Sequence, residues 1–117
     1  MQYLLLIYGQ ESFWGTIPDA ERQKIYTEYG DLIQDMQKAG SYKGGHQLQP
    51  IATASTVRVR NGKKTVTDGP FAETKEQLGG YFLVEAKDLD EALSLAARIP
   101  SVRDGSIEVR PVVANRM

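Results

Sequence analysis

Residues 3–8 read Tyr-Leu-Leu-Leu-Ile-Tyr and are followed by Gly9. A continuous apolar run of this length is typical of a strand that is buried on both faces, in the middle of a sheet. The run is far too short to cross a bilayer. A second run, Tyr81-Phe82-Leu83-Val84, comes after Gly79-Gly80 and predicts another central strand. The chain is therefore expected to build a sheet with these two segments at its centre.

Two helices are expected to pack on this sheet. The first begins at Pro18, since proline is tolerated in a first helical turn, and Gly40 is its expected C-cap. The second begins at Asp88, with Glu91 at the capping-box position, and Pro100 ends it. Each helix carries an apolar stripe at spacings of three and four. The stripes are Ile25, Tyr29, Leu32, Ile33 and Met36 in the first helix and Leu89, Ala92, Leu93 and Ala96 in the second.

A β-hairpin is the clearest local signal between the two helices. Residues 56–60 and 63–67 flank Asn61-Gly62, a dipeptide that suits a type I′ turn because both positions need φ > 0. Closing the hairpin there places Val57 opposite Val66. Four cationic side chains are then largely solvated, and their crowding protects the exposed edges from pairing with other strands. They are Arg58, Arg60, Lys63 and Lys64.

The order of elements predicts an α+β fold. Residues 42–48 and 107–110 complete the set of strands, which gives β-α-β, a hairpin and β-α-β. Two such units form a ferredoxin-like antiparallel sheet with both helices on one face. No segment remains to cover the other face, so we expect a homodimer with its sheets face to face. Residues 1–113 are expected to form this single domain, and residues 114–117 a frayed tail.

Composition excludes several classes of chemistry. The 117 residues include no Cys and one His, so disulfides and cysteine nucleophiles are excluded, and a His-rich metal site would need several chains. We expect no metal and no cofactor. The formal net charge of −1 gives no electrostatic case for binding nucleic acid or an anionic membrane. With no membrane span and no basic segment before the first apolar run, we expect a soluble, cytoplasmic protein.

A longer motif carries a family resemblance. Residues 68–76 read Asp-Gly-Pro-Phe-Ala-Glu-Thr-Lys-Glu and are followed by Leu78-Gly79-Gly80-Tyr81. Together with the opening strand at 1–8, the helix start at 88–92 and the closing residues 105–111, this segment resembles the DGPF-domain proteins of the YCII-related family. The resemblance implies a dimeric α+β barrel of ferredoxin-like subunits. For some relatives it also implies small-molecule turnover or an association with alternative sigma factors.

One departure limits what the resemblance implies about chemistry. YCII relatives proposed to be enzymes resemble one another in a His on the first helix, paired with an Asp. The helix predicted at 18–39 contains no His, and the single imidazole, His46, follows Gly44-Gly45. No residue of this chain matches the family's helix His.

His46 and Asp68 are nevertheless the candidate catalytic residues. The ordinary pKa of His lies near neutrality, which suits proton transfer. Asp68 precedes Gly69-Pro70, so its carboxylate either caps a turn or acts as a general base in a cleft. If the fold brings the two residues within hydrogen-bond reach, the carboxylate orients the ring and raises its pKa. Otherwise His46 is expected at the surface or an interface.

Aromatic side chains are the candidate ligand contacts. Residues 9–17 are expected to form a loop that carries Phe13 and Trp14 and acts as a lid. We expect Tyr8, Trp14 and Phe71 to line a largely apolar cleft near the DGPF segment. The same aromatics can equally anchor a dimer interface, where such residues are enriched.

The acidic and basic residues that follow the DGPF segment have a structural interpretation. Glu73, Lys75 and Glu76 are expected to cap and pair within a helical turn at 73–77. A metal site formed by Asp68, Glu73 and Glu76 lacks any recognised ligand spacing.

Three functions follow from these residues. The first is binding of a small organic ligand in the cleft. The second is an enzyme that uses His46 and Asp68 for elimination, isomerisation or hydrolysis. The third is an accessory or regulatory partner of sigma-factor-dependent transcription, acting through the exposed hairpin.

Overall fold

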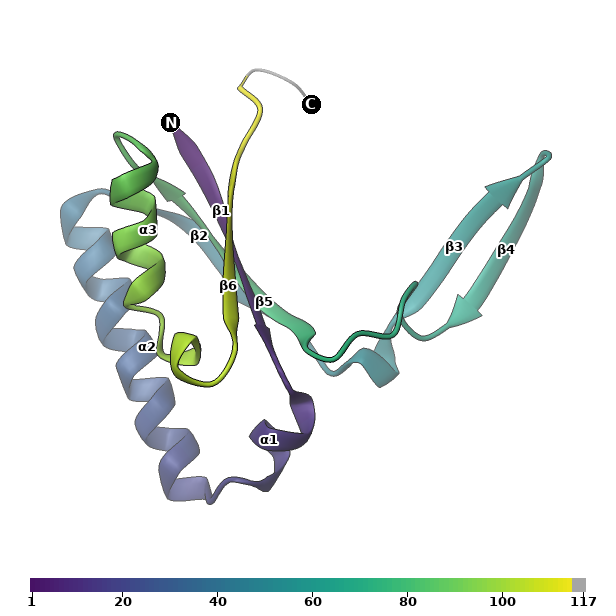
Figure 1. Ribbon diagram of the computed structural model, residues 1–117, viewed down its shortest axis with the longest axis horizontal. Helices are drawn as coiled ribbons and strands as arrows, with labels where there is room; N and C mark the ends of the chain where they lie inside the picture. Colours follow the sequence, from purple (N-terminus) through teal and green to yellow (C-terminus); the bar gives the residue numbers. More distant parts are fainter. Residues whose placement is uncertain (115–117) are drawn as a thin grey trace.

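The computed structural model describes residues 1–114 and contains the expected β-α-β, hairpin, β-α-β order (Figure 1). It adds one short α-helix and two 3-10 helices. The elements are β1 (Gln2–Gly9), α1 (Glu11–Thr16), α2 (Asp19–Ala39), β2 (Tyr42–Gln47), η1 (Ile51–Thr53), β3 (Ser55–Arg60), β4 (Lys63–Asp68), β5 (Gln77–Glu85), α3 (Leu89–Ala97), η2 (Pro100–Arg103) and β6 (Ser106–Pro111).

The main sheet has four antiparallel strands in the order β2-β5-β1-β6. The two apolar runs therefore occupy the central strands, as their composition predicts. Leu4 lies opposite Leu83, and Leu6 lies opposite Tyr81. This arrangement confirms the α+β, ferredoxin-like fold class.

The hydrophobic core lies between one face of this sheet and the helices. Tyr3, Leu5, Phe82 and Val84 alternate along β1 and β5 and are 5 % exposed or less. They pack against Leu32 and Met36 of α2, Ala92 and Ala96 of α3, and Ile99. Both long helices consequently cover the same side of the sheet (Figure 1).

The opposite face of the sheet carries the alternate residues of the same strands. Leu4, Leu6, Leu83 and Tyr81 share this helix-free face and are half-buried. Along its β6 edge, Glu108 forms an ion pair with Arg110. We call this surface the helix-free face.

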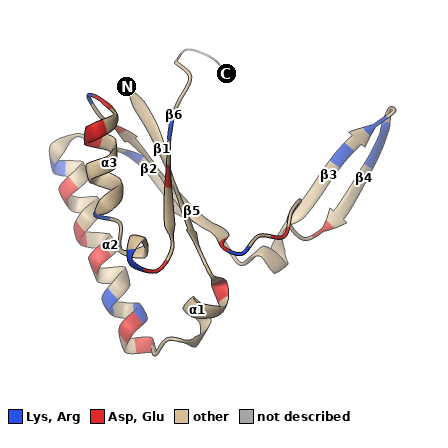
Figure 2. Ribbon diagram, viewed as in Figure 1, with Lys and Arg blue, Asp and Glu red and all other residues tan. Residues whose placement is uncertain are grey.

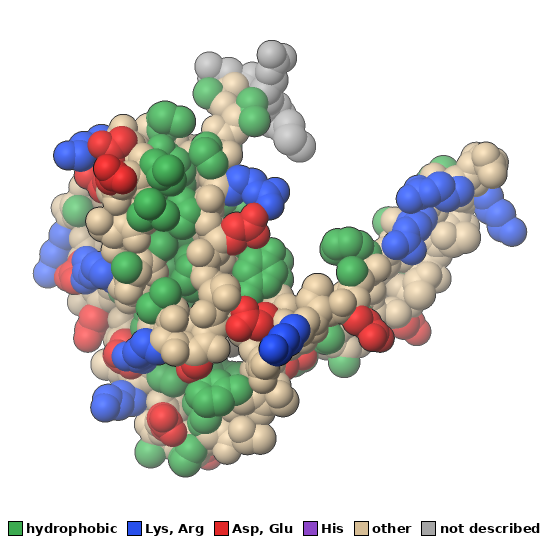
Figure 3. All heavy atoms as spheres, viewed as in Figure 1, with side chains coloured by type: hydrophobic (Ala, Val, Ile, Leu, Met, Phe, Trp, Pro, Cys, Tyr) green, Lys and Arg blue, Asp and Glu red, His purple; other side chains and the backbone are tan. Residues whose placement is uncertain are grey.

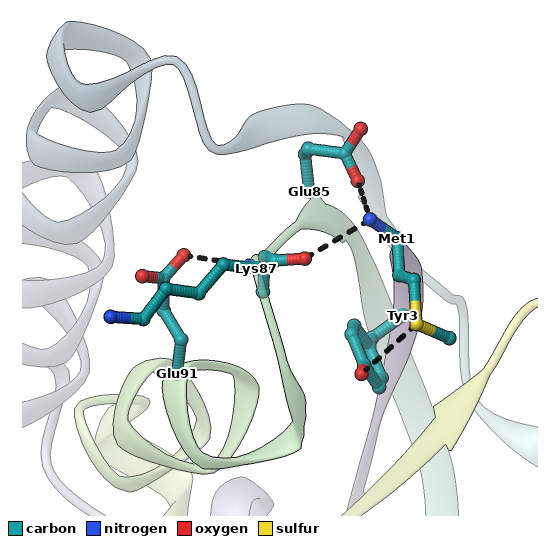
Figure 4. A network of polar contacts seen from close by, with 6 residues as sticks. Met1, Tyr3, Glu85, Lys87 and Glu91 are labelled. Atoms are coloured by element: carbon teal, nitrogen blue, oxygen red, sulfur yellow. Dashed lines mark hydrogen bonds and ion pairs between the residues drawn. The ribbon is translucent and has the colours of Figure 1, made fainter.

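The helix ends follow the predicted capping chemistry. Gly40 ends α2 at φ 77°, and the N–H of Ser41 donates to the carbonyl of Met36 at 2.8 Å. At the start of α3 the carboxylate of Asp88 accepts from the N–H of Glu91 at 2.9 Å. The Glu91 carboxylate reaches back to the N–H of Lys87 at 3.2 Å (Figure 4), one residue earlier than the capping-box pattern places it.

The same view shows how β1 is held at its start. The amino group of Met1 lies 2.8 Å from a carboxylate oxygen of Glu85 and donates to the carbonyl of Ala86 at 3.1 Å (Figure 4). The hydroxyl of Tyr3 contacts the sulfur of Met1 at 3.8 Å. These contacts fasten β1 to the end of β5.

The predicted buried stripe of α3 is wrong in part. Ala92 and Ala96 are buried, whereas Leu89 and Leu93 are 48 % and 46 % exposed. Leu95 packs on the core in their place. The nine-residue helix has apolar residues on more than one side, and it turns its two alanines and Leu95 to the sheet, where the small side chains allow close approach.

The hairpin forms as predicted, in a two-stranded sheet of its own. Asn61 and Gly62 have φ of 54° and 74°, as a type I′ turn requires, and Val57 lies opposite Val66. Its cationic side chains are exposed and gather in the outer half of the hairpin (Figure 2).

Two loop predictions are wrong. Residues 11–16 form helix α1, in which the carbonyl of Gln10 accepts from the N–H groups of Phe13 and Trp14. Gln10 makes no side-chain cap, so the sequence carried no start signal. The helical turn expected at 73–77 is absent, because side-chain bonds from Thr74 and Gln77 to nearby carbonyls hold irregular bends instead.

At the C-terminus, residue 114 is an exposed turn, and residues 115–117 of the expected tail lie outside the described residues. Within residues 1–114, no helix combines the length and hydropathy that a membrane crossing would need.

Candidate ligand-binding cleft

A cavity of about 620 Å³ lies between the sheet, the N-terminal half of α2, α1 and η2. The core residues Leu32 and Met36 belong to the C-terminal half of α2, where α3 also packs. Toward its N-terminus α2 has no neighbouring helix of similar length, so the space beneath it stays open. Aromatic side chains line much of this space, namely Phe13, Trp14, Tyr26, Tyr29, Tyr42 and Phe82.

Helix α1 forms one wall of the cleft. The ring of Trp14 meets that of Tyr26 edge-on, with centroids 5.4 Å apart and planes at 88°. The guanidinium of Arg22, which also pairs with Asp19, donates to the carbonyl of Trp14 at 2.9 Å. The hydroxyl of Tyr26 is hydrogen bonded to the side-chain amide of Gln47 on β2. Trp14 is therefore held by contacts to α2, which is itself linked to the edge strand.

Glu11 and Gln77 fasten α1 to the rest of the fold. The side-chain oxygen of Gln77 accepts from the N–H of Glu11 at 3.0 Å, and the Glu11 carboxylate accepts from the N–H of Ile51 at 2.9 Å. The amide nitrogen of Gln77 donates to the carbonyl of Thr74 at 2.7 Å. One glutamine side chain thus joins the cleft wall to the segment 69–76.

The inner wall is built from Tyr29, Phe82 and Tyr42. The ring of Phe82 lies 6.1 Å from that of Tyr29 and 6.0 Å from that of Tyr42. The Tyr29 hydroxyl and the Ser101 hydroxyl are 2.6 Å apart. Burial raises the pKa of Tyr29 above its ordinary value of 10.0, and the hydrogen bond to Ser101 opposes this effect. Tyr29 is therefore a neutral hydroxyl at physiological pH.

Two glycines allow β2 to approach β5 closely beside the cleft. A Cβ on Gly45 would lie 2.5 Å from a ring carbon of Phe82, and one on Gly80 would lie 2.8 Å from the carbonyl oxygen of His46. Neither position has room for a side chain. The absence of side chains at Gly45 and Gly80 therefore allows β2 to pair with β5 and leaves room for the Phe82 ring.

The charged groups along the cavity are unevenly distributed. Of the described residues that line it, Glu11 and Asp104 are carboxylates and none is Lys or Arg. The other polar side chains include the amides of Gln10, Gln47 and Gln77 and the hydroxyl of Ser101. The lining therefore combines aromatic surface, neutral hydrogen-bonding groups and negative charge.

The structure places His46 and Asp68 in different sheets. His46 lies on edge strand β2 opposite Tyr81, and its ring nitrogen Nδ1 is 2.9 Å from the Tyr81 hydroxyl. Asp68 is the last residue of β4, opposite Ser55 at the base of the hairpin. Within one chain the hydrogen-bond partner of His46 is Tyr81. The His46–Asp68 pair stays a prediction.

The three predicted ligand contacts lie in different places. Trp14 and Tyr8 are among the residues along the cavity. The hydroxyl of Tyr8 also contributes, after Arg110, to lowering the pKa of Glu108. Phe71 is 79 % exposed and is not among the cavity residues. Within one chain, then, the cleft takes its aromatic surface from α1, α2 and the strands β2 and β5, and not from the DGPF segment.

Comparison with known proteins agrees with the motifs of the sequence. A family model described as the YCII-related domain matches residues 1–116. The chain belongs to the YCII-related family. A relative from Rhizobium meliloti (strain 1021), the uncharacterised protein R00369, is 36 % identical over 114 residues, which cover 96 % of this chain and 92 % of the relative.

The acidic residues around the DGPF segment of this YCII-related protein do not gather. The Glu76 carboxylate accepts from the Ser106 hydroxyl at 2.8 Å, and Glu73 is exposed. Within residues 1–114 no group of three or more His, Asp or Glu side chains is arranged to hold a metal ion.

Some cleft residues of the YCII-related protein were missed by sequence reasoning. Tyr26 and Gln77 were not singled out, although each fastens part of the wall. Tyr26 lies next to the apolar stripe of α2 and is not part of it. Its partner, Trp14, lies on helix α1, and the sequence did not predict that helix. Gln77 carried no signal, because its three hydrogen bonds join segments that are distant or irregular.

Proposed function

We propose that this YCII-related protein binds a small, largely apolar organic molecule without net negative charge in the aromatic cleft. The observation that carries the proposal is the cavity of about 620 Å³ lined by Trp14, Tyr26, Tyr29 and Phe82. Ligand pockets of small molecules typically enclose some 300–1,000 Å³ of mostly apolar surface with a few placed polar groups. The cleft matches this description in size and in composition.

The charge preference rests on the groups along the cavity. Glu11 and Asp104 repel an anion, and no Lys or Arg among the described cavity residues compensates for them. The faces of Trp14, Tyr26 and Tyr29 attract cations as well as apolar groups. A neutral or cationic aromatic or alkyl compound is therefore the class of ligand that this lining favours.

Trp14 gives a direct test, because it is the only tryptophan of the chain. Its fluorescence is titrated with three probes of similar shape and different charge: phenyltrimethylammonium, tert-butylbenzene and benzenesulfonate. We expect saturable changes with the cation and the neutral probe. The anion is expected to bind at least about tenfold more weakly, a difference of about 1.4 kcal/mol.

The charge preference has a matched pair of variants. Glu11→Gln removes a carboxylate of the cleft, whereas Asp31→Asn removes one from a part of α2 that does not line it. Glu11→Gln should reduce the difference in affinity between the cationic and the anionic probe. Asp31→Asn should leave that difference unaltered. If no probe changes the Trp14 emission, the binding proposal fails. If the anion binds as tightly as the cation, only the charge preference fails.

We propose further that two copies associate through the helix-free face. Leu4, Leu6 and Leu83 are only half-buried there, although they occupy the central strands of the sheet. An apolar sheet face of this kind is stabilised when a second sheet covers it. Sedimentation at micromolar concentration should show a dimer, and a monomer at all concentrations would contradict the proposal.

A second candidate function is acid–base catalysis by His46 with Asp68. The ring of His46 is exposed on the helix-free face, where it is hydrogen bonded to the Tyr81 hydroxyl, an arrangement that can orient an imidazole for proton transfer. Any turnover found for the protein should fall at least about 100-fold in His46→Ala and in Asp68→Asn. Full turnover in both variants would exclude this mechanism.

A further inference from the structure

The hairpin of β3 and β4 is the part of the fold that the proposed cleft does not use. It stands apart from the four-stranded sheet, on the side away from α2 and α3 (Figure 1). The radius of gyration is 16.2 Å. A compact chain of this length would have a radius of gyration of about 13 Å. The chain is therefore a small domain with a projecting arm, defined here as residues 55–68.

The two faces of this arm differ in chemistry. One face carries Val57, Val59 and Val66, with Lys64 beside them near the turn and Asp68 at the base. The other face carries Arg58, Arg60 and Lys63 among threonines. Such alternation is typical of strands with one buried and one solvated face. The three valines are nevertheless 62 %, 59 % and 63 % exposed.

An isolated two-stranded hairpin is at best marginally stable in water. The valine face therefore has the composition of a surface that another surface covers. Residues 1–114 of its own chain do not supply that cover, since the valines stay exposed there.

We propose that the valine face of the arm packs against a second copy of this chain, beside its helix-free face. The arm projects on the side of the sheet that the helices leave open (Figure 1). The space-filling view shows apolar side chains on the body and at the base of the arm, with open space between the body and the arm (Figure 3). A twofold dimer fills this gap in both copies at once, because each contributes one arm and one sheet face.

Charge favours a second copy over other occupants. The arm has four Lys or Arg and one Asp, a net charge of +3, and the other 103 residues have ten Lys or Arg and fourteen Asp or Glu, a net charge of −4. The arm of one copy is thus attracted to the body of another. Nucleic acid would be attracted to the arm but repelled by the body, and the arm has no aromatic residue on which bases stack.

This inference rests on the proposed homodimer and extends it, and a pair of variants separates the two. Val57→Thr with Val66→Thr keeps side-chain shape and strand preference but removes apolar surface from the valine face. Thr65→Ser with Thr67→Ser changes the opposite face and controls for weakened strand preference. By sedimentation we expect the valine variant to raise the dimer dissociation constant on the order of 100-fold, and the control by less than about threefold.

Hydrogen exchange of the wild-type chain gives a second measurement that needs no variant. It is recorded well above and well below the dimer dissociation constant. The amides of residues 55–68 should become protected at the higher concentration, together with the exchange changes in β1 that accompany dimer formation.

Three results would overturn the proposal. A monomer at every concentration overturns both the arm contact and the homodimer. A dimer whose arm exchanges as fast as in the monomer, and which tolerates the valine variant, overturns the arm contact alone. Protection of the arm only after addition of DNA or RNA assigns it to nucleic acid.

Discussion

Adding one methyl group at Gly45 should test the close approach of β2 to β5 beside the cleft. The Cβ of Gly45→Ala would lie 2.5 Å from a ring carbon of Phe82 and 2.8 Å from the carbonyl oxygen of Tyr81, whereas ordinary contacts begin at 3.4 Å. The ring must therefore move by close to 1 Å, and the backbone of β5 limits where β2 can go. Overpacking of this kind costs about 1–3 kcal/mol.

Gly30→Ala is the matched control, since it adds the same methyl group to open space. Nothing lies within 4 Å of a Cβ at Gly30, which occupies the interior of α2. Alanine is about 0.8–1 kcal/mol more favourable than glycine in a helix interior. The two substitutions should therefore change the free energy of unfolding in opposite directions.

Urea denaturation followed by circular dichroism measures both effects. The midpoint should fall for Gly45→Ala and rise for Gly30→Ala, with little change in the slope. The displaced Phe82 ring should also weaken probe binding in Gly45→Ala. Equal or greater stability of Gly45→Ala would refute the close strand approach, and destabilisation of both variants would show that the effect is not specific to the site.

Three further changes test local contacts. Asp88→Ala removes the N-cap of α3 and should lower the free energy of unfolding by about 1 kcal/mol in chemical denaturation, while an unchanged value would argue against the cap. Gln77→Leu removes the acceptor of the Glu11 N–H, so Trp14 should become more accessible to acrylamide quenching; unchanged quenching would mean that α1 is held by other contacts. The hydrogen bond from Arg103 lowers the pKa of Glu28 below its ordinary value of 4.5, so this pair stabilises the fold above that pH and the stabilisation is lost as the pH falls through the lowered value. Wild type should therefore be slightly more stable than Glu28→Gln at pH 7, and this advantage should shrink in acid and in high salt. An advantage that grows in acid would contradict the lowered pKa of Glu28.

The central strands and the hairpin could be predicted because their signals are local. A continuous apolar run such as Tyr3–Tyr8 is most favourable in a central strand of a sheet. Asn61-Gly62 suits a type I′ turn, which few other dipeptides form. The start of α2 and its end at Gly40 follow from residue types that act within one turn. These features need no knowledge of distant parts of the chain.

The errors arise where distant contacts decide the outcome. Helix α1 has no capping side chain, and its position depends on bonds to Gln77 and Ile51, far along the chain. In α3 apolar residues lie on more than one side of the helix. Packing against the sheet decides that Leu95 is buried while Leu89 and Leu93 are exposed. The spacing of apolar residues along the sequence does not predict which of these leucines is buried.

The candidate site was predictable in kind but not in detail. Trp14, a large aromatic residue before the first long helix, was predicted to contact a ligand, and it lines the cavity. Phe71 belongs to the most recognisable motif of the chain, yet it is exposed and away from the cavity within one chain. A motif marks the family, whereas the cavity depends on how α1 and α2 sit over the sheet.

The measurement that tests the central claim most directly is where a bound probe lies in the protein. Nuclear Overhauser effects are recorded between the methyl protons of phenyltrimethylammonium and the aromatic protons of the protein. We expect contacts to the rings of Trp14, Tyr26 and Tyr29, which line the cleft together. Contacts to Phe71 instead, or saturable binding without any contact to Trp14, would contradict this expectation.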